Sequence, residues 1–171
     1  MDGGTRRSEI LEVLKTAEKP VSASRLAKRF SVSRQIIVGD IALLRAAGLE
    51  VTATARGYLL EQQDDNGLVV KIACQHQPEQ TEEELTAIVE LGGEVLDVIV
   101  EHPIYGELTG NLRIKSQKDV GDFIKAYKKS RASLLSELTG GIHLHTIRCE
   151  NQQMVEAVKE ELARKGILYQ N

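Results

Sequence analysis

The spacing of the apolar residues changes near residue 50, and this change limits the possible folds more than any other feature. Up to Gly48 the apolar residues recur three and four positions apart, which is the period of a helix. Beyond Val51, short stretches with the two-residue period of a strand alternate with helical stretches. The 171 residues suffice for one large domain or two small ones. We therefore predict an α+β protein with two differently built parts.

The charged residues divide at a similar place. Residues 1–60 contain 10 Lys and Arg against 6 Asp and Glu, a balance of +4. Residues 61–171 contain 12 against 19, a balance of −7, so the net charge of −3 hides the division. A basic part followed by an acidic part indicates two domains with different partners, which we place at 1–62 and 68–171. The polar, acidic stretch 61–67 has the composition of a linker.

The first part is predicted to contain three helices and a hairpin, over residues 6–16, around Leu26 to Phe30, over 34–47 and over 51–60. Ser22 or Ser24 can cap the second helix, and Ser33 can cap the third. Gly48 ends the third helix, because glycine readily takes the left-handed conformation found just after a helix. This order is typical of a winged helix-turn-helix domain.

In such a domain the third helix enters the major groove of DNA with its N-terminal residues at the base edges. Those residues are Ser33, Arg34 and Gln35. Arginine suits guanine, glutamine suits adenine, and serine can bind a phosphate. The cations expected to contact phosphates lie on the second helix, the third helix and the hairpin: Arg25, Lys28, Arg29, Arg45 and Arg56. The alternative is a three-helix bundle that contacts other proteins.

Two residues inside the third helix are unusual for a helix that reads DNA. Gly39 costs about 1 kcal/mol relative to alanine in a helix interior. It either allows close approach to a backbone or is simply tolerated. Asp40 would repel phosphates, so we expect it to pair with a nearby arginine.

The second part alternates strands and helices in the order β-α-β-β-α-β-α. The expected strands cover residues 68–76, 94–102, 107–114 and 142–149, and the expected helices lie at 81–91, around 120–127 and around 155–162. Two neighbouring strands within this alternation indicate an α+β sandwich with a mostly antiparallel sheet and helices on one face.

All four histidines lie in this acidic part. His143 and His145 are two residues apart on an expected strand, so both imidazoles lie on one face. If the strand that ends at His76 is their neighbour, three imidazoles and the carboxylate of Glu84 can converge. That set suits a divalent transition ion such as Zn, Ni, Co or Fe(II).

Each of these residue types also has an explanation that involves no metal. Glu84 can close a capping box with Thr81 at the start of its helix. A histidine at the end of a strand is commonly a surface or hydrogen-bonded residue. Cys74 and Cys149 share strand faces with the histidines and are either thiolate ligands or small buried residues.

His102 continues the apolar face of its strand and meets Tyr105 in the sequence His-Pro-Ile-Tyr-Gly. It can bind an anionic effector or support the metal ligands. The alternative is a core histidine that bonds to a backbone carbonyl.

Several classes of protein are excluded. No apolar run reaches the ~18–20 residues that cross a bilayer, and the N-terminus has no apolar signal-peptide segment. Two cysteines do not make a disulfide framework, so we expect a cytoplasmic protein.

The sequence resembles the 3H-domain family of niacin-responsive transcription regulators. The resemblance covers about residues 6–168 and rests on the third-helix motif at 33–48 and on the histidine pattern: His76, His-Pro-Ile-Tyr-Gly at 102–106, and His143-x-His145. It implies a bacterial repressor of NAD biosynthesis and niacin uptake genes that binds DNA as a dimer when nicotinic acid is bound. It also implies an HPr-like regulatory domain and a transition-metal site at four matching positions: His76, Glu84, His143 and His145.

We therefore predict a homodimeric repressor that binds a palindromic operator, with nicotinic acid as co-repressor and nickel or zinc as the favoured metal. His102 and Tyr105 are the expected effector contacts, and the β-rich second part is the expected place of dimerisation. A repressor for which the metal itself is the signal is the main alternative. A metal-dependent enzyme and a phosphocarrier suggested by fold alone are further alternatives.

Overall fold

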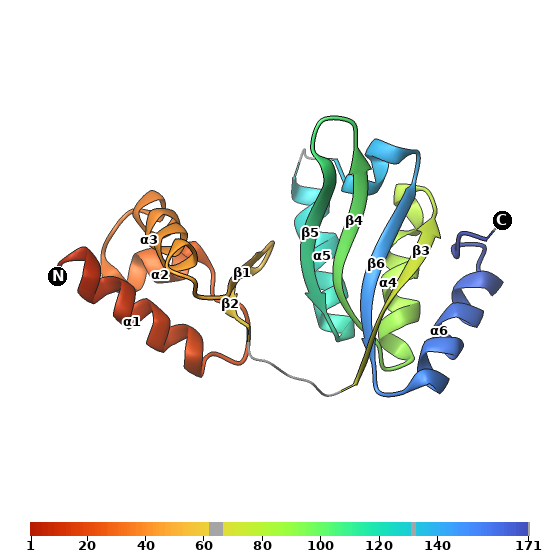
Figure 1. Cartoon of the computed structure of the whole chain (residues 1–171), viewed down its shortest axis with the longest axis horizontal. Helices are drawn as coiled ribbons and strands as arrows, with labels where there is room; N and C mark the ends of the chain where they lie inside the picture. The colour runs from red at the N-terminus through yellow and green to blue at the C-terminus, as the bar shows by residue number, and fades with distance from the viewer. Residues whose placement is uncertain (62–66, 131–132, 171) are drawn as a thin grey trace. The chain divides into compact units, whose positions relative to one another are not determined.

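The computed structural model describes residues 1–61, 67–130 and 133–170. The chain forms two compact units, Met1–Asp64 and Asp65–Asn171, each with its own core (Figure 1). Most of the expected linker, residues 62–66, lies outside the described residues. None of the described helices is both long enough and apolar enough to span a bilayer.

The N-terminal unit has the expected order of three helices and a hairpin. Its elements are α1 (Gly3–Thr16), α2 (Ala23–Phe30), α3 (Arg34–Ala46), β1 (Val51–Thr54) and β2 (Gly57–Leu60). The two strands pair as an antiparallel ribbon, and the backbone of Tyr58 exchanges two hydrogen bonds with Val21 just before α2. The ribbon is therefore fixed to the helices, as the wing of a winged helix-turn-helix domain is.

Side-chain caps determine where these helices begin. Ser22 and Ser33 each accept a hydrogen bond from the backbone N–H three residues further on. The cap of α2 is therefore Ser22 and not Ser24. Helix α1 begins at Gly3, three residues earlier than expected, because the Asp2 carboxylate caps it.

Aliphatic side chains from the three helices and β1 form the core of this unit, among them Ile10, Leu14, Leu26, Ile37, Ile41, Leu44 and Val51. Asp40 also points inward and is only 3% exposed. It accepts hydrogen bonds from Arg6 Nε at 2.6 Å and from Arg7 Nη1 at 3.3 Å. The expected pairing of Asp40 with an arginine is confirmed, and both partners come from α1. Because Asp40 is the one acidic residue of α3, this helix presents no carboxylate outward.

The C-terminal unit follows the expected order β-α-β-β-α-β-α, with two additional short 3₁₀ helices, η1 and η2. Its elements are β3 (Leu68–Gln75), η1 (Pro78–Gln80), α4 (Thr81–Glu90), β4 (Glu94–His102), β5 (Gly106–Ile114), α5 (Gln117–Lys129), η2 (Leu135–Thr139), β6 (Ile142–Cys149) and α6 (Gln152–Arg164).

The four strands form an antiparallel sheet in the order β3-β6-β4-β5. Helices α4, α5 and α6 pack on one face of this sheet, so the predicted α+β sandwich is confirmed (Figure 1). The first and last strands of the unit are neighbours, with Cys74 opposite His143 and Ile72 opposite His145. This pairing brings the end of β3 next to the histidines of β6.

The predicted capping box between Thr81 and Glu84 is wrong. The chain enters α4 through η1, so Thr81 already lies inside a helical turn and does not cap α4 with its side chain. At the start of η1, Gln77 N–H instead donates to Gln80 Oε1 at 3.4 Å. Glu84 is therefore not used by the helix terminus, and its side chain turns toward the sheet.

We expect the N-terminal core to depend on Leu26, which is fully buried. Leu26→Ala should lower the free energy of unfolding of this unit by about 2–5 kcal/mol, because it leaves a cavity among aliphatic side chains. Urea unfolding followed by far-ultraviolet circular dichroism measures the change. Leu43→Ala is the matched control, since Leu43 is 54% exposed on α3 and its loss should cost about 0.5 kcal/mol or less. Equal effects of the two variants would contradict the described core.

Candidate functional site

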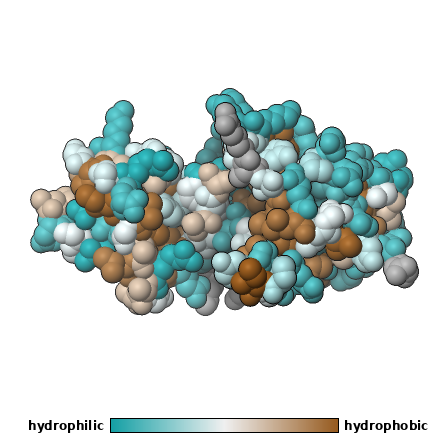
Figure 2. Space-filling model, turned by 90° about the horizontal axis from the view of Figure 1, so that it is seen from above, coloured by the Kyte–Doolittle hydropathy of each residue, from teal (hydrophilic) through white to brown (hydrophobic). Residues whose placement is uncertain are grey.

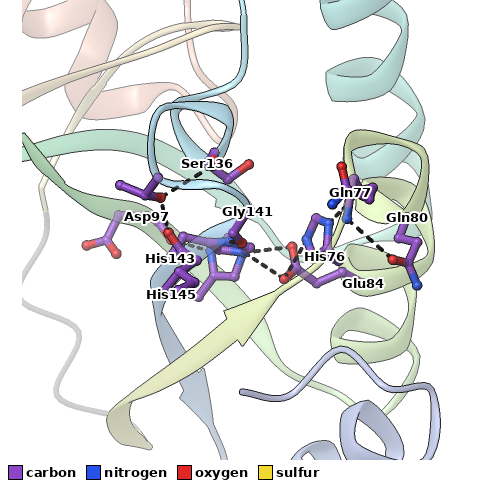
Figure 3. A network of polar contacts seen from close by, with 11 residues as sticks. His76, Gln77, Gln80, Glu84, Asp97, Ser136, Gly141, His143 and His145 are labelled. Atoms are coloured by element: carbon purple, nitrogen blue, oxygen red, sulfur yellow. Dashed lines mark hydrogen bonds and ion pairs between the residues drawn. The ribbon is translucent and has the colours of Figure 1, made fainter. Parts of the chain in front are cut away.

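The pairing of β3 with β6 and the position of α4 bring the four predicted ligands together. His143 and His145 are two residues apart on β6, so their side chains lie on the same face of the sheet. This is the face on which the helices pack. His76 follows β3 directly, and its backbone N–H donates to the carbonyl of Gly141 just before β6. Glu84 enters from the first turns of α4. Figure 3 shows the three imidazoles turned toward the Glu84 carboxylate.

The contacts within this cluster are short, and all four residues are at most 5% exposed. The Nε2 atoms of His76 and His143 lie 2.9 and 2.8 Å from Glu84 Oε2. His145 Nε2 lies 2.9 Å from the other oxygen, Oε1. Neighbouring rings stand nearly perpendicular, with centroids 4.7 and 4.8 Å apart. The Glu84 carboxylate and the Nε2 atoms of the three histidines therefore lie together at a single buried site, with Glu84 at its centre.

The opposite nitrogen of every ring bonds to the backbone. The Nδ1 atoms lie 2.7 Å from Gln77 O for His76, 2.9 Å from Gly141 O for His143 and 2.7 Å from Asp97 O for His145. A carbonyl oxygen only accepts hydrogen bonds, so each Nδ1 must carry the proton. Each Nε2 then points at Glu84 with a lone pair, or with a second proton if the ring is charged. This is the orientation that outer contacts give to metal-binding histidines.

The cluster needs positive charge at its centre. Three neutral rings would aim three lone pairs at the oxygens of a carboxylate, and acceptors facing acceptors repel. Three charged rings would bury three cations against one anion. His76 Nε2 is buried and has no hydrogen-bond partner among the described residues, although it lies close to Glu84. A divalent ion removes both problems, and nitrogen and carboxylate ligands suit Zn, Ni, Co and Fe(II).

The pKa values of the cluster reflect the attraction between the Glu84 carboxylate and the histidine rings. Burial lowers the pKa of His145, but Glu84 and Asp97 together outweigh burial and hold this pKa above its ordinary value. The pKa of His76 is raised in the same way, against burial, by its contacts with Glu84. Burial alone would raise the pKa of Glu84, yet the surrounding histidines lower it well below its ordinary value. Without a metal, the contacts therefore favour protonated rings at His76 and His145 beside an ionised Glu84 carboxylate.

Gly141 is required where β6 begins. Its backbone has a φ of 94°, which side chains rarely allow. A Cβ at this position would lie 2.4 Å from the carbonyl oxygen of His76. The glycine therefore permits the backbone of His76 to lie close to Gly141. The Gly141 carbonyl then contacts both the backbone N–H of His76 and the Nδ1 of His143.

The two cysteines differ in their relation to the cluster. Cys74 Sγ, a Glu84 oxygen and a His143 ring nitrogen all lie within 4.8 Å of one another. Burial, and then the Glu84 carboxylate, raise the pKa of the Cys74 thiol, so it stays protonated in the metal-free protein. Cys149 is a buried member of the apolar core, where burial also raises its pKa. Of the two, Cys74 is the one placed near the cluster.

A small cavity of about 40 Å³ adjoins the cluster. Besides the His76–Glu84–His143–His145 cluster, its walls include Leu112, Phe123, Leu135, Ser136 and Thr81. The buried Thr81 hydroxyl, on the same wall, has no hydrogen-bond partner among the described residues. The sequence pattern marked Phe123 only as part of a buried helix face and gave no signal for Ser136, because η2 has no periodic pattern.

His102 and Tyr105, the expected effector contacts, do not line this cavity. The Nδ1 of His102 accepts hydrogen bonds from the backbone N–H groups of Ile104 and Tyr105, at 3.1 and 3.3 Å. Its ring stacks at a tilt on Tyr105, with centroids 5.1 Å apart. His102 thus closes the β4–β5 turn and is not a core histidine that bonds to a backbone carbonyl. Its role as an effector contact stays a prediction. Figure 2 looks onto this end of the C-terminal unit and shows hydrophobic residues among hydrophilic ones.

The predicted DNA contacts lie on the α2–α3 surface and on the wing. Arg25 and Lys28 are exposed on α2, and Arg34 and Gln35 are exposed in the first turn of α3. Ser33 is exposed and caps α3 through its hydroxyl oxygen. Arg56 lies at the turn between the two strands of the wing, where its backbone N–H donates to Thr54 Oγ1. These side chains lie on the elements that contact DNA in a winged helix-turn-helix domain, and their contacts with DNA stay predictions.

We expect the metal-free protein to lose stability as the pH rises above neutrality. The pKa values of His76 and His145 are raised in the folded state from 6.5, so their contribution is complete below pH 6.5 and is lost as the pH rises through the folded values. Glu84 acts in the opposite direction, because its lowered pKa gives a contribution that is present above pH 4.5 and lost in acid.

Calorimetry in the presence of a chelator, at constant ionic strength, measures this effect. The Tm of the C-terminal unit should fall as the pH rises from 6.5 into the alkaline range. Glu84→Gln should flatten the profile because it removes the charge that raises the pKa values of His76 and His145. A Tm that rises over this range would contradict the described contacts.

Two family profiles match the chain. An HTH domain matches residues 6–59 and a 3H domain matches residues 69–171. The chain is also similar to a probable transcription repressor NiaR of Thermotoga maritima, with 41% identity over 163 residues that cover 95% of this chain and 93% of that protein. It is similar to the transcription repressor NadR of Bacillus subtilis, with 41% identity over 170 residues that cover 97% and 94%. The chain therefore belongs to the 3H-domain family of helix-turn-helix proteins.

Proposed function

We propose that the protein is a transcription repressor of NAD biosynthesis and niacin uptake genes, with nicotinic acid as co-repressor and a transition metal in its C-terminal unit. The observation that carries the proposal is the buried cluster of three histidines and Glu84, with every Nδ1 bonded to a carbonyl, in the same chain as a helix-turn-helix unit. Two relatives named transcription repressors, each aligned over more than nine-tenths of its length, support a DNA-binding regulator rather than an enzyme.

His76, Glu84, His143 and His145 would hold the metal. A bound divalent ion supplies a Lewis-acidic position to which a carboxylate or a pyridine nitrogen can bind. The four residues would leave such a site with a net charge of +1, since Glu84 is its one anion. The domain has a negative net charge, and this local positive charge would attract a small anion to the site.

The cavity beside the cluster is the proposed place of the effector, rather than the turn formed by His102 and Tyr105. Phe123 and Leu112 offer apolar walls for a planar ring, and the Thr81 hydroxyl offers a donor without a partner among the described residues. The cavity measures about 40 Å³, whereas pockets for small molecules commonly measure ~300–1,000 Å³. Entry of nicotinate therefore requires side chains of η2, such as Leu135, to move outward. That movement couples effector binding to the backbone that precedes β6.

A homodimer would present two copies of α3 to one face of DNA. Recognition helices of such dimers lie about 34–36 Å apart, one turn of the double helix. The operator would then be an inverted repeat. Effector binding would favour the arrangement of the two copies that meets this spacing.

The small size of the cavity also favours a second candidate, a repressor for which the metal itself is the signal. Four side chains of the chain complete a buried cluster, and the space beside it is far below that of an ordinary ligand pocket. In this case the metal would change the affinity for DNA without nicotinate.

We expect nicotinate to raise the affinity of the metal-loaded protein for its operator by tenfold or more. The probe is a double-stranded DNA selected from a pool of random sequences by the Ni²⁺-loaded protein with nicotinate present. Fluorescence anisotropy at a stated salt concentration compares four states: with and without Ni²⁺, and with and without nicotinate. Equal affinity with and without nicotinate, combined with dependence on Ni²⁺, would select the metal sensor.

We expect His143→Ala to abolish stoichiometric metal binding, because it removes one ligand and the outer contact with Gly141. His102→Ala is the matched control, since His102 lies in a turn and does not line the cluster cavity. Metal content after dialysis and the nicotinate response of DNA binding are the two measurements. If His143→Ala keeps both, or if His102→Ala loses its metal, the site is wrongly assigned.

A further inference from the structure

Gly39 occupies the middle of α3, where the fold does not require a glycine. Its φ is not positive, and apart from neighbouring backbone of α3 no atom of the described residues lies within 4 Å of the position that a Cβ would take. An exposed glycine in a helix interior is unfavourable relative to alanine, because the unfolded chain gains freedom and the helix gains no contact. The residue therefore lowers the stability of α3 without any benefit inside the described protein.

The surface of α3 around Gly39 is apolar. Ile37, Ile41 and Leu44 point into the core, so the opposite side of the helix carries Gln35, Gly39 and Ala42. Val38 is next to them and is 43% exposed. Asp40, the one charged residue between Arg34 and Arg45, is buried against α1. From residue 36 to residue 44, α3 thus offers no exposed polar side chain.

Hydrogen-bonded reading of bases by α3 is therefore confined to its ends. Arg34 and Gln35 can bond to base edges at the N-terminal turn. Beyond them, the face of the helix can recognise only shape and apolar groups. In the major groove the C5 methyl group of thymine is the apolar group that distinguishes one base from the others.

We propose that Gly39 is the point where the backbone of α3 approaches the base pairs most closely, and that Val38 and Ala42 beside it contact thymine methyl groups. The proposal rests on the proposed function, because it needs α3 to bind in the major groove. It explains why a costly glycine stands at a position with open space: the missing Cβ leaves room for DNA. A larger side chain at this position would hold the helix away from the bases and would weaken the contacts on both sides.

The protein half of the test compares two glycines. Gly121 lies inside α5, is exposed, and also has no atom within 4 Å of a Cβ position, so it matches Gly39 in all but location. Gly39→Ala and Gly121→Ala should both raise the thermal stability of the unit that contains them. Only Gly39→Ala should weaken binding to the selected duplex, by tenfold or more, whereas Gly121→Ala should bind as the parent does.

The DNA half of the test removes single methyl groups. The duplex selected by the full-length, Ni²⁺-loaded protein with nicotinate is synthesised again with deoxyuridine in place of thymidine, one position at a time. Uracil keeps every hydrogen-bonding group of thymine and lacks only the methyl group. Burial of one methyl group corresponds to about a fourfold change in affinity. Uracil should therefore weaken binding about fourfold at one or two positions of each half-site. Val38→Ala should abolish the difference at the position that Val38 contacts.

The outcomes separate this inference from the proposed function. A duplex that is selected and bound in a nicotinate-dependent way, but is insensitive to uracil and to Gly39→Ala, overturns the inference and leaves the proposed function standing. Failure to select any duplex overturns both. Loss of binding in Gly39→Ala together with a lower thermal stability would make Gly39 a structural residue and would also overturn the inference.

Discussion

The antiparallel pairing of β3 with β6 is the contact on which the C-terminal unit depends. It joins the first and last strands of the unit, which are more than sixty residues apart in the sequence. It also leaves α4 above the histidines, so that Glu84 meets two rings from β6 and the ring of His76, which follows β3 directly. Without this pairing β3 would not belong to the sheet, and His76 would no longer lie beside Glu84, His143 and His145.

Much of the fold follows from hydrophobic spacing, because both cores are built from aliphatic residues at regular intervals. The order of helices and strands can be predicted in this way. The Ser33 cap and the pairing of Asp40 with an arginine can be predicted from residue type and charge. The shared face of His143 and His145 can also be anticipated, since two-residue spacing on a strand puts both side chains on one side of the sheet. What spacing alone does not give is which strand is the neighbour of which, because strand order depends on packing between distant segments.

The errors come from places where local rules compete. Thr81 and Glu84 have the spacing of a capping box, but η1 continues the helix backwards and removes the free terminus that such a box would satisfy. His102 has the position of a core residue, yet the tight turn after Pro103 gives its ring two backbone donors and a role in closing that turn. The outer contacts of the cluster are invisible in the sequence for a simpler reason. They are made by backbone carbonyls, such as that of Gly141, which every residue type possesses.

The inward pairing of Asp40 changes how the basic character of the N-terminal unit should be understood. Arg6 and Arg7 are bonded to a buried carboxylate, so two of the cations that produce its positive balance neutralise charge within the unit. The number of counterions released when a protein binds DNA depends on the phosphates it contacts and not on its total charge. The salt dependence of DNA binding should therefore reflect a footprint made by α2, the first turn of α3 and the wing, and this footprint is smaller than the composition of the unit implies.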